Sequence, residues 1–197
     1  MTKGKILSIV GIVILVSVIS GVGKYLAKNS TNDASAAWRT VDSPSGSFTA
    51  LFPENHAAGF SKDPQLLNNQ KTTMPGINAE VSLLDYGSVD LDGASYFLTA
   101  VTFPNTVDTS NDDNFLKMGL DKLGSKDHEI SSTPTMFGQY KGLNYSFSDT
   151  LDGGVLFSKG RIIKAGKSMY LLMVTYGEDK FNQDNYNKFM TSFIIKK

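Results

Sequence analysis

Hydrophobic residues form one continuous run near the N-terminus and alternate with polar residues through much of the remaining chain. The run extends from Ile6 to Gly23, contains 18 uncharged residues dominated by Ile, Val and Leu, and is bordered by lysines on both sides. As a helix it would be about 27 Å long, close to the ~30 Å hydrocarbon core of a bilayer. We therefore predict a transmembrane helix within residues 1–28 that anchors the chain in the lipid bilayer.

The anchor has one serious alternative, a cleaved signal peptide. Hydrophobic cores of signal peptides usually run ~7–15 residues, shorter than this one, although Val18-Ile-Ser20 would pass as a weak cleavage site. Basic residues flank the run almost equally, so the positive-inside rule decides little, and the short N-terminal tail favours an N-in orientation. We expect a single pass of the inner or plasma membrane with the C-terminal domain outside the cytoplasm, or a secreted, periplasmic domain if the segment is cleaved.

A small polar segment, residues 29–37, follows and has the composition of a flexible linker. The folded domain is expected to cover residues 38–197, with Trp38, the only tryptophan, buried at its start. Alternation or runs of apolar residues predict strands in this domain. These strands are near residues 48–52, 81–86, 96–103, 143–148, 155–164 and 168–176, the last two forming a hairpin around Ala165-Gly166-Lys167.

Two helices are predicted from apolar residues at helical spacing. The first would be capped by Ser110 and present Leu116, Leu120 and Leu123 on one face. The second would be capped by Asn182, with Phe181 packed on Tyr186 as a hydrophobic staple. Its apolar stripe comprises Tyr186, Phe189, Met190 and Phe193. Hairpin-connected strands with two separate helices predict an α+β fold, a central antiparallel sheet with helices on both faces.

Both ends of this domain carry a pattern of core and turn residues that resembles a known group. The first is Trp38-x4-Ser43-x2-Gly46-x-Phe48-x3-Phe52-Pro53, and the second is Phe189-x2-Ser192-Phe193. They resemble the PsbP-like superfamily, which includes an extrinsic subunit of the oxygen-evolving complex and many bacterial envelope proteins. The resemblance implies an α/β/α sandwich and a non-enzymatic binding or assembly role. It transfers no ligand-binding residue.

Composition and charge exclude several classes of function. The chain has no cysteine, which excludes disulfides and thiolate metal sites, and its two histidines are too few for most zinc sites. Four of the 19 basic residues fall within residues 1–28, which hold no acid, so the remaining chain has 15 bases and 19 acids. An acidic domain with scattered bases argues against a nucleic-acid partner.

Several short motifs resemble binding sites, and we interpret them as ordinary structure. Gly166-Lys167-Ser168 lacks the first glycine of a phosphate loop and lies between strands instead of before a helix. Asp90-Leu-Asp92-Gly93 and Asp149-Thr-Leu-Asp152-Gly153 carry acids beside glycine, but Asp-Gly is an ordinary turn signal and no closing glutamate follows. Asp112 and Asp113 suit a helix N-terminus. His56 and His128 are expected to be solvated histidines.

The sequence therefore predicts no catalytic residue, no cofactor and no metal site. The expected function is that of a membrane-tethered extracytoplasmic binding or assembly module with an unidentified protein partner in the envelope. Two alternatives remain, a periplasmic protein that binds a small molecule or lipid and a hydrolase without recognisable motifs.

Overall fold

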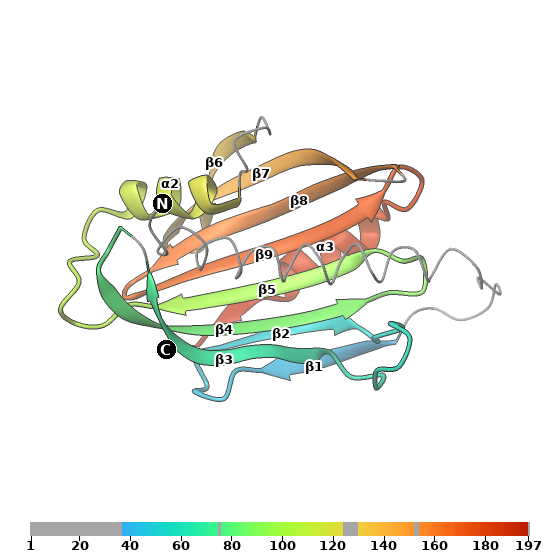
Figure 1. Ribbon diagram of the computed structural model, residues 1–197, viewed down its shortest axis with the longest axis horizontal. Helices are drawn as coiled ribbons and strands as arrows, with labels where there is room; N and C mark the ends of the chain where they lie inside the picture. The colour runs from blue at the N-terminus through green and yellow to red at the C-terminus, as the bar shows by residue number, and fades with distance from the viewer. Residues whose placement is uncertain (1–36, 75, 124–129, 152–153, 197) are drawn as a thin grey trace, which may run out of the picture.

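A computed structural model describes residues 37–196 except residues 75, 124–129 and 152–153 (Figure 1). The predicted transmembrane helix, Ile6–Gly23, lies outside these residues, as do nearly all of the linker, His128, Asp152 and Gly153. Within the described ranges, no helix has the length and hydrophobicity needed to cross a membrane.

Seven strands form one antiparallel sheet, in the order β3-β4-β5-β9-β8-β7-β6 (Figure 1). All six of its pairings are antiparallel. Its strands, in chain order, are β3 (Gln65–Met74), β4 (Ala79–Val89), β5 (Ser95–Thr102), β6 (Ser131–Phe137), β7 (Tyr140–Leu151), β8 (Gly154–Ala165) and β9 (Ser168–Gly177). We call this the large sheet.

A second, small sheet has the order β1-β2-β10. It joins β1 (Trp38–Asp42), β2 (Phe48–Pro53) and the two-residue β10 (Ile194–Ile195). The sequence places β10 directly after the last helix, so the two ends of the folded domain meet in one sheet. Ser192 strengthens this junction, because its hydroxyl accepts a hydrogen bond from the Leu51 amide at 2.9 Å.

Two helices complete the described fold. Helix α2 (Asp112–Leu123) packs on β7, β8 and β9, and α3 (Gln183–Ser192) packs mainly on β2. The cap of α2 is Asn111, whose side chain accepts from the Asn114 amide at 3.1 Å, so the expected cap Ser110 is wrong by one residue. The expected cap of α3 is confirmed, since the Asn182 side chain accepts from the Asn185 amide at 3.0 Å.

The predicted α/β/α sandwich is wrong. Of the described residues, 55% lie in strands and 15% in helices. The layer over one face of the large sheet is built from the small sheet together with α3, and not from helices alone. Residues 48–52 were correctly predicted as a strand, but its membership in a separate sheet depends on partners far away in sequence, which periodicity does not reveal.

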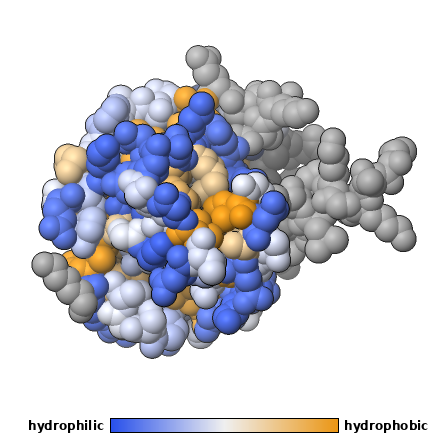
Figure 2. Space-filling view, turned by 90° about the vertical axis from the view of Figure 1, so that its left-hand side faces the viewer, coloured by the Kyte–Doolittle hydropathy of each residue, from blue (hydrophilic) through white to orange (hydrophobic). Residues whose placement is uncertain are grey.

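Two clusters of buried side chains hold the layers together. The first lies between the large sheet, the small sheet and α3, and is rich in aromatic rings: Phe48, Phe52, Tyr96, Tyr170, Phe189 and Phe193. The second lies on the opposite face of the large sheet and includes Phe97, Phe103, Phe115, Ile162 and Met169. Away from these clusters the surface is mainly hydrophilic, with small apolar patches at the end viewed in Figure 2.

Trp38 is half-buried and packs against the first cluster, so the prediction of a buried tryptophan is correct only in part. It lies on β1, an edge strand of the small sheet, where only one side of its ring meets the core. That side contacts Tyr96 edge-on with ring centroids 6.1 Å apart. The Lys188 ammonium lies 4.7 Å from the Trp38 ring centroid.

Candidate functional site

The Asp90–Gly93 segment is a turn between β4 and β5, as the sequence indicated. Asp90 is buried, and its Oδ1 accepts from the amides of Asp92 at 3.0 Å and Ala94 at 2.9 Å. Its Oδ2 accepts from the Tyr96 hydroxyl at 3.0 Å. Burial raises the Asp90 pKa, and these donors oppose the shift. Both oxygens of the carboxylate are therefore engaged by donors of the β4–β5 turn and of β5.

Gly166 and Lys167 form a two-residue turn, because Ala165 pairs directly with Ser168 in the β8–β9 hairpin. Gly166 has φ +56°, a left-handed conformation that glycine adopts without strain. The Lys167 ammonium donates to the Val107 carbonyl at 2.6 Å. The hairpin is confirmed, but its loop is one residue shorter than the predicted three-residue loop, because Ala165 belongs to β8. The lysine holds the segment before α2 to the sheet.

The remaining motif residues also have structural surroundings. His56 is half-buried, and its Nδ1 lies 2.8 Å from the Lys62 ammonium. Burial lowers the pKa of His56, and the positive charge of Lys62 lowers it further. Asp112 and Asp113 lie in the first turn of α2 and pair with Lys164 and Lys141. No three metal-binding side chains (His, Asp or Glu) cluster within the described residues.

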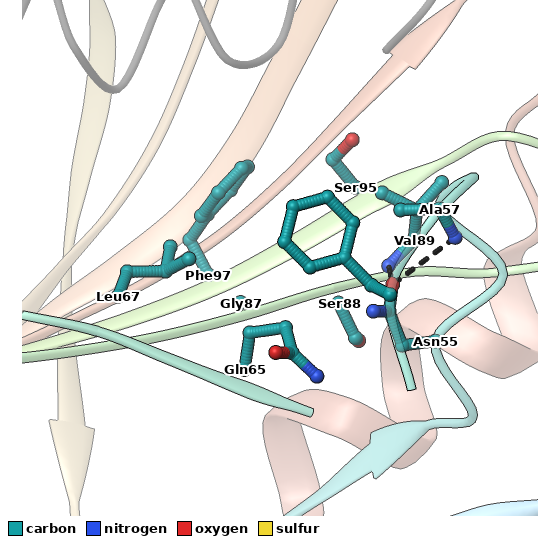
Figure 3. Close-up of a pocket in the computed structure, with 10 residues that line it drawn as sticks. Asn55, Ala57, Gln65, Leu67, Gly87, Ser88, Val89, Ser95 and Phe97 are labelled. Atoms are coloured by element: carbon teal, nitrogen blue, oxygen red, sulfur yellow. Dashed lines mark hydrogen bonds between the residues drawn. The ribbon is translucent and has the colours of Figure 1, made fainter. Parts of the chain in front are cut away.

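An apolar pocket lies at one end of the large sheet, beside its β3 edge (Figure 3). Its floor is the start of β5 and the end of β4, and its wall is the loop of residues 54–64 that joins β2 to β3. In Figure 3 Leu67 and Phe97 lie at one side of this space, and the Gln65 amide turns toward the loop, where its Nε2 donates to Ser61 Oγ at 3.0 Å and to the Asp63 carbonyl at 2.6 Å. The lining residues are Asn55, Ala57, Phe60, Gln65, Leu67, Gly87, Ser88, Val89, Ser95 and Phe97.

The floor of this pocket depends on the absence of a side chain at Gly87. A Cβ there would lie 2.8 Å from Leu67 Cδ1 and 3.3 Å from the Phe97 ring. Leu67 reaches the space because a β-bulge interrupts the pairing of β3 with β4 between Leu66 and Asn68. A β-bulge changes the direction of a side chain relative to the regular alternation of a strand. Gly87 and the bulge together therefore form the pocket.

Asn55 fixes the wall of the pocket to the sheet. Its Oδ1 accepts from the amides of Ala57 and Val89, each at 3.2 Å, and its Nδ2 donates to the Ser61 carbonyl at 3.2 Å. The His56 amide donates to the Val89 carbonyl at 2.7 Å. The loop is therefore preorganised, which lowers the entropic cost of binding.

The chemistry of the pocket suits an apolar group. None of its ten lining residues has an ionisable side chain. Ser88 contributes a buried hydroxyl oxygen that has no hydrogen-bond partner within the described structure. The cavity volume is about 40 Å³, far below the ~300–1,000 Å³ of typical small-molecule sites. The pocket can accept the tip of one apolar side chain together with one hydrogen-bonding group.

Exposed apolar residues surround the opening. Phe60 is 55% exposed on the wall, and Leu67 is 43% exposed on the β3 side. Neither was identified from the sequence, although two signals were present. Phe60 follows Ala57-Ala58-Gly59 in a connecting segment, and Gly87 interrupts an apolar strand, which often marks a close approach.

Comparison with protein-family models finds no match for this chain, and no curated protein is significantly similar to it. The resemblance to the PsbP-like superfamily therefore stays a prediction.

Proposed function

We propose that the protein is a membrane-tethered binding module of the cell envelope whose pocket beside β3 receives an apolar side chain of a protein partner. The observation that carries this proposal is the preorganised apolar pocket with exposed Phe60 and Leu67 at its opening. The tether is inferred from the uncharged run Ile6–Gly23.

The size of the pocket favours a protein partner over a free lipid or small molecule. A cavity of about 40 Å³ encloses little of a lipid chain, whereas a side chain presented by a folded or extended partner needs only a shallow hollow. Anchoring aromatic or aliphatic residues in such hollows supplies much of the energy in protein interfaces.

The lining also argues for binding and against catalysis. Hydrolysis needs a nucleophile or activated water with a base within hydrogen-bond reach. Ser88 and Ser95 are the hydroxyl groups in the lining, and no base lies among the residues that line this pocket.

Site-specific photocrosslinking tests the proposal with the full chain in its own cells. A photoreactive amino acid is placed at Phe60, and the matched control carries it at Met136, which is 59% exposed on β6, the opposite edge of the large sheet. We expect a discrete crosslinked protein from position 60 and not from position 136. Equal crosslinking from both positions, or none from position 60, contradicts the proposal.

A further inference from the structure

Two positively charged side chains, Lys159 and Arg161, lie next to each other on β8. Strand alternation puts both on the face of the large sheet that carries the buried Ile163. Residues two apart on a strand are about 7 Å apart, and both cations are near Tyr186, since the Lys159 ammonium lies 5.9 Å from its ring centroid and Arg161 lowers its pKa. In the neighbouring β7, Ser146 and Asn144 stand opposite them in register.

Neither cation forms an ion pair with a carboxylate of the described residues. Other cations of this domain do, for example Arg39 with Glu54, Lys141 with Asp113 and Lys196 with Asp42. The acids that follow β9 in sequence, Glu178, Asp179 and Asp184, are exposed, and within the described residues none of them is paired with Lys159 or Arg161. Among the described residues these two adjacent positive charges therefore have no counter-ion.

The contacts of both cations leave donors available. The Lys159 ammonium lies 4.8 Å from the Phe181 ring centroid and 5.9 Å from that of Tyr186. Arg161 donates from Nε to Asn144 Oδ1 at 2.8 Å, which orients the guanidinium, and neither terminal nitrogen donates a hydrogen bond within the described residues. The aromatic rings thus hold the lysine without neutralising it.

The start of α3 adds to the positive potential here. Phe181 and Tyr186 flank the N-terminal turn of α3, the positive end of the helix dipole. Burial raises the pKa of the Tyr186 phenol, and nearby Arg161 acts in the opposite direction. The phenol remains protonated at neutral pH and is a further hydrogen-bond donor.

From this arrangement we infer a second site, at which Lys159 and Arg161 bind a phosphoryl group against the aromatic wall formed by Phe181 and Tyr186. A phosphoryl group carries about −1.5 to −2 charges and several acceptor oxygens, which matches two cations with neighbouring hydroxyl donors. Arginine and lysine in combination supply the planar fork and the point charge that recur in phosphate recognition. The inference is independent of the pocket beside β3.

The chain offers an internal control for testing this site. Its only two arginines are Arg39 and Arg161, so the arginine Nε region of a ¹H–¹⁵N spectrum contains two side-chain signals. The full chain in nanodiscs of neutral lipid is titrated with inorganic phosphate, and with chloride at equal ionic strength. We expect a saturable shift of the Arg161 signal in phosphate alone, while Arg39, already paired with Glu54, does not move.

Variants separate a site from general charge attraction. Lys159→Gln should weaken phosphate binding about tenfold, as expected for loss of one charge-assisted hydrogen bond. The control Lys117→Gln, which removes the same charge from the exposed face of α2, should leave it unchanged. Parallel shifts of both arginines, no saturation, or equal weakening by Lys117→Gln would overturn the inference.

Nanodiscs that contain anionic phospholipid identify the source of the phosphoryl group. If a lipid headgroup occupies the site, the Arg161 signal is shifted before phosphate is added and inorganic phosphate reverses part of the shift. If the group comes from a soluble compound, the signal is the same in both types of nanodisc and moves with added phosphate. If Arg161 responds in neither arm, no phosphoryl site exists there.

Discussion

The two faces of the large sheet differ in what covers them. One face meets the small sheet and α3 through contacts between aromatic rings, such as Phe52 with Phe189 at a centroid distance of 5.0 Å. The other face meets α2, whose contacts fall on β7, β8 and β9. The pocket lies on this second face, toward β3, since Phe97 belongs to the second cluster. The face covered by the small sheet and α3 contributes most to the stability of the fold, and the face covered by one helix leaves room for the pocket beside β3.

The largest effect should come from a ring in the face covered by the small sheet and α3. Phe189 is fully buried and contacts both Phe52 and Tyr96. Phe189→Ala should lower the free energy of unfolding by about 3–5 kcal/mol, measured by urea denaturation. Phe115→Ala, on the α2 face, should cost less, because Phe115 is 9% exposed and lies on a single covering helix. If Phe115→Ala lowered the free energy of unfolding more than Phe189→Ala does, the proposed difference between the two faces would be wrong.

Two glycines, one on β8 and one on α2, allow a finer comparison of the sheet with its covering helix. At Gly160 a Cβ would collide with the Leu172 carbonyl oxygen and the Tyr145 hydroxyl, and the backbone carbonyl cannot move away cheaply. Gly160→Ala should therefore cost at least the ~1–3 kcal/mol typical of overpacking. At Gly119, on α2, the nearest atom is Met169 Sδ at 3.0 Å, a flexible side chain. Gly119→Ala should be nearly neutral, since alanine favours the helix by ~1 kcal/mol. Similar thermal shifts for both variants would contradict this reasoning.

Two buried aspartates allow a test by pH. Burial raises the pKa of Asp85 above its usual 3.8, and its Oδ1 has no hydrogen-bond partner among the described groups. The folded state then binds the proton more tightly than the unfolded state, so the carboxylate costs stability as pH rises above about 4. Asp85→Asn should stabilise by roughly 1–3 kcal/mol at pH 7 and by less at pH 4.

Asp90 is the matched comparison, because its pKa is also raised by burial but three donors already satisfy it. Asp90→Asn should gain less at pH 7 than Asp85→Asn. Denaturation curves at both pH values decide the matter, and an Asp85→Asn gain that is as large at pH 4 as at pH 7 would show that burial of the charge is not its cause.

The smallest effect concerns Trp38. Lys188→Gln removes the ammonium 4.7 Å from the ring centroid and should cost about 0.5–1 kcal/mol, the range for an exposed cation–π contact. Because Trp38 is the only tryptophan, its fluorescence reports the change directly. Unaltered emission in the variant would show that the contact is not maintained in solution.

Central elements could be predicted from the sequence, and edges could not. Strands β5 and β9 are apolar on both faces, and the apolar stripe of α3 follows helical spacing, so all three elements could be predicted. The edge strands β3 and β6 are mostly exposed and polar, with Pro134 inside β6, and gave no periodic signal. The strand β10 has two residues. The pocket escaped prediction because β3 forms one of its sides and Gly87 acts by lacking a side chain.

The central claim, that the pocket beside β3 binds a partner, is tested most directly by filling it. Gly87→Ala places a methyl group against Leu67 and Phe97, whereas Gly177→Ala meets only Lys180 Cγ at 3.8 Å and is the matched control. The measurement is the yield of the crosslink formed from position 60 in each background. We predict a loss of most of the crosslink with Gly87→Ala and a wild-type yield with Gly177→Ala. An undiminished crosslink in a folded Gly87→Ala protein would contradict the account.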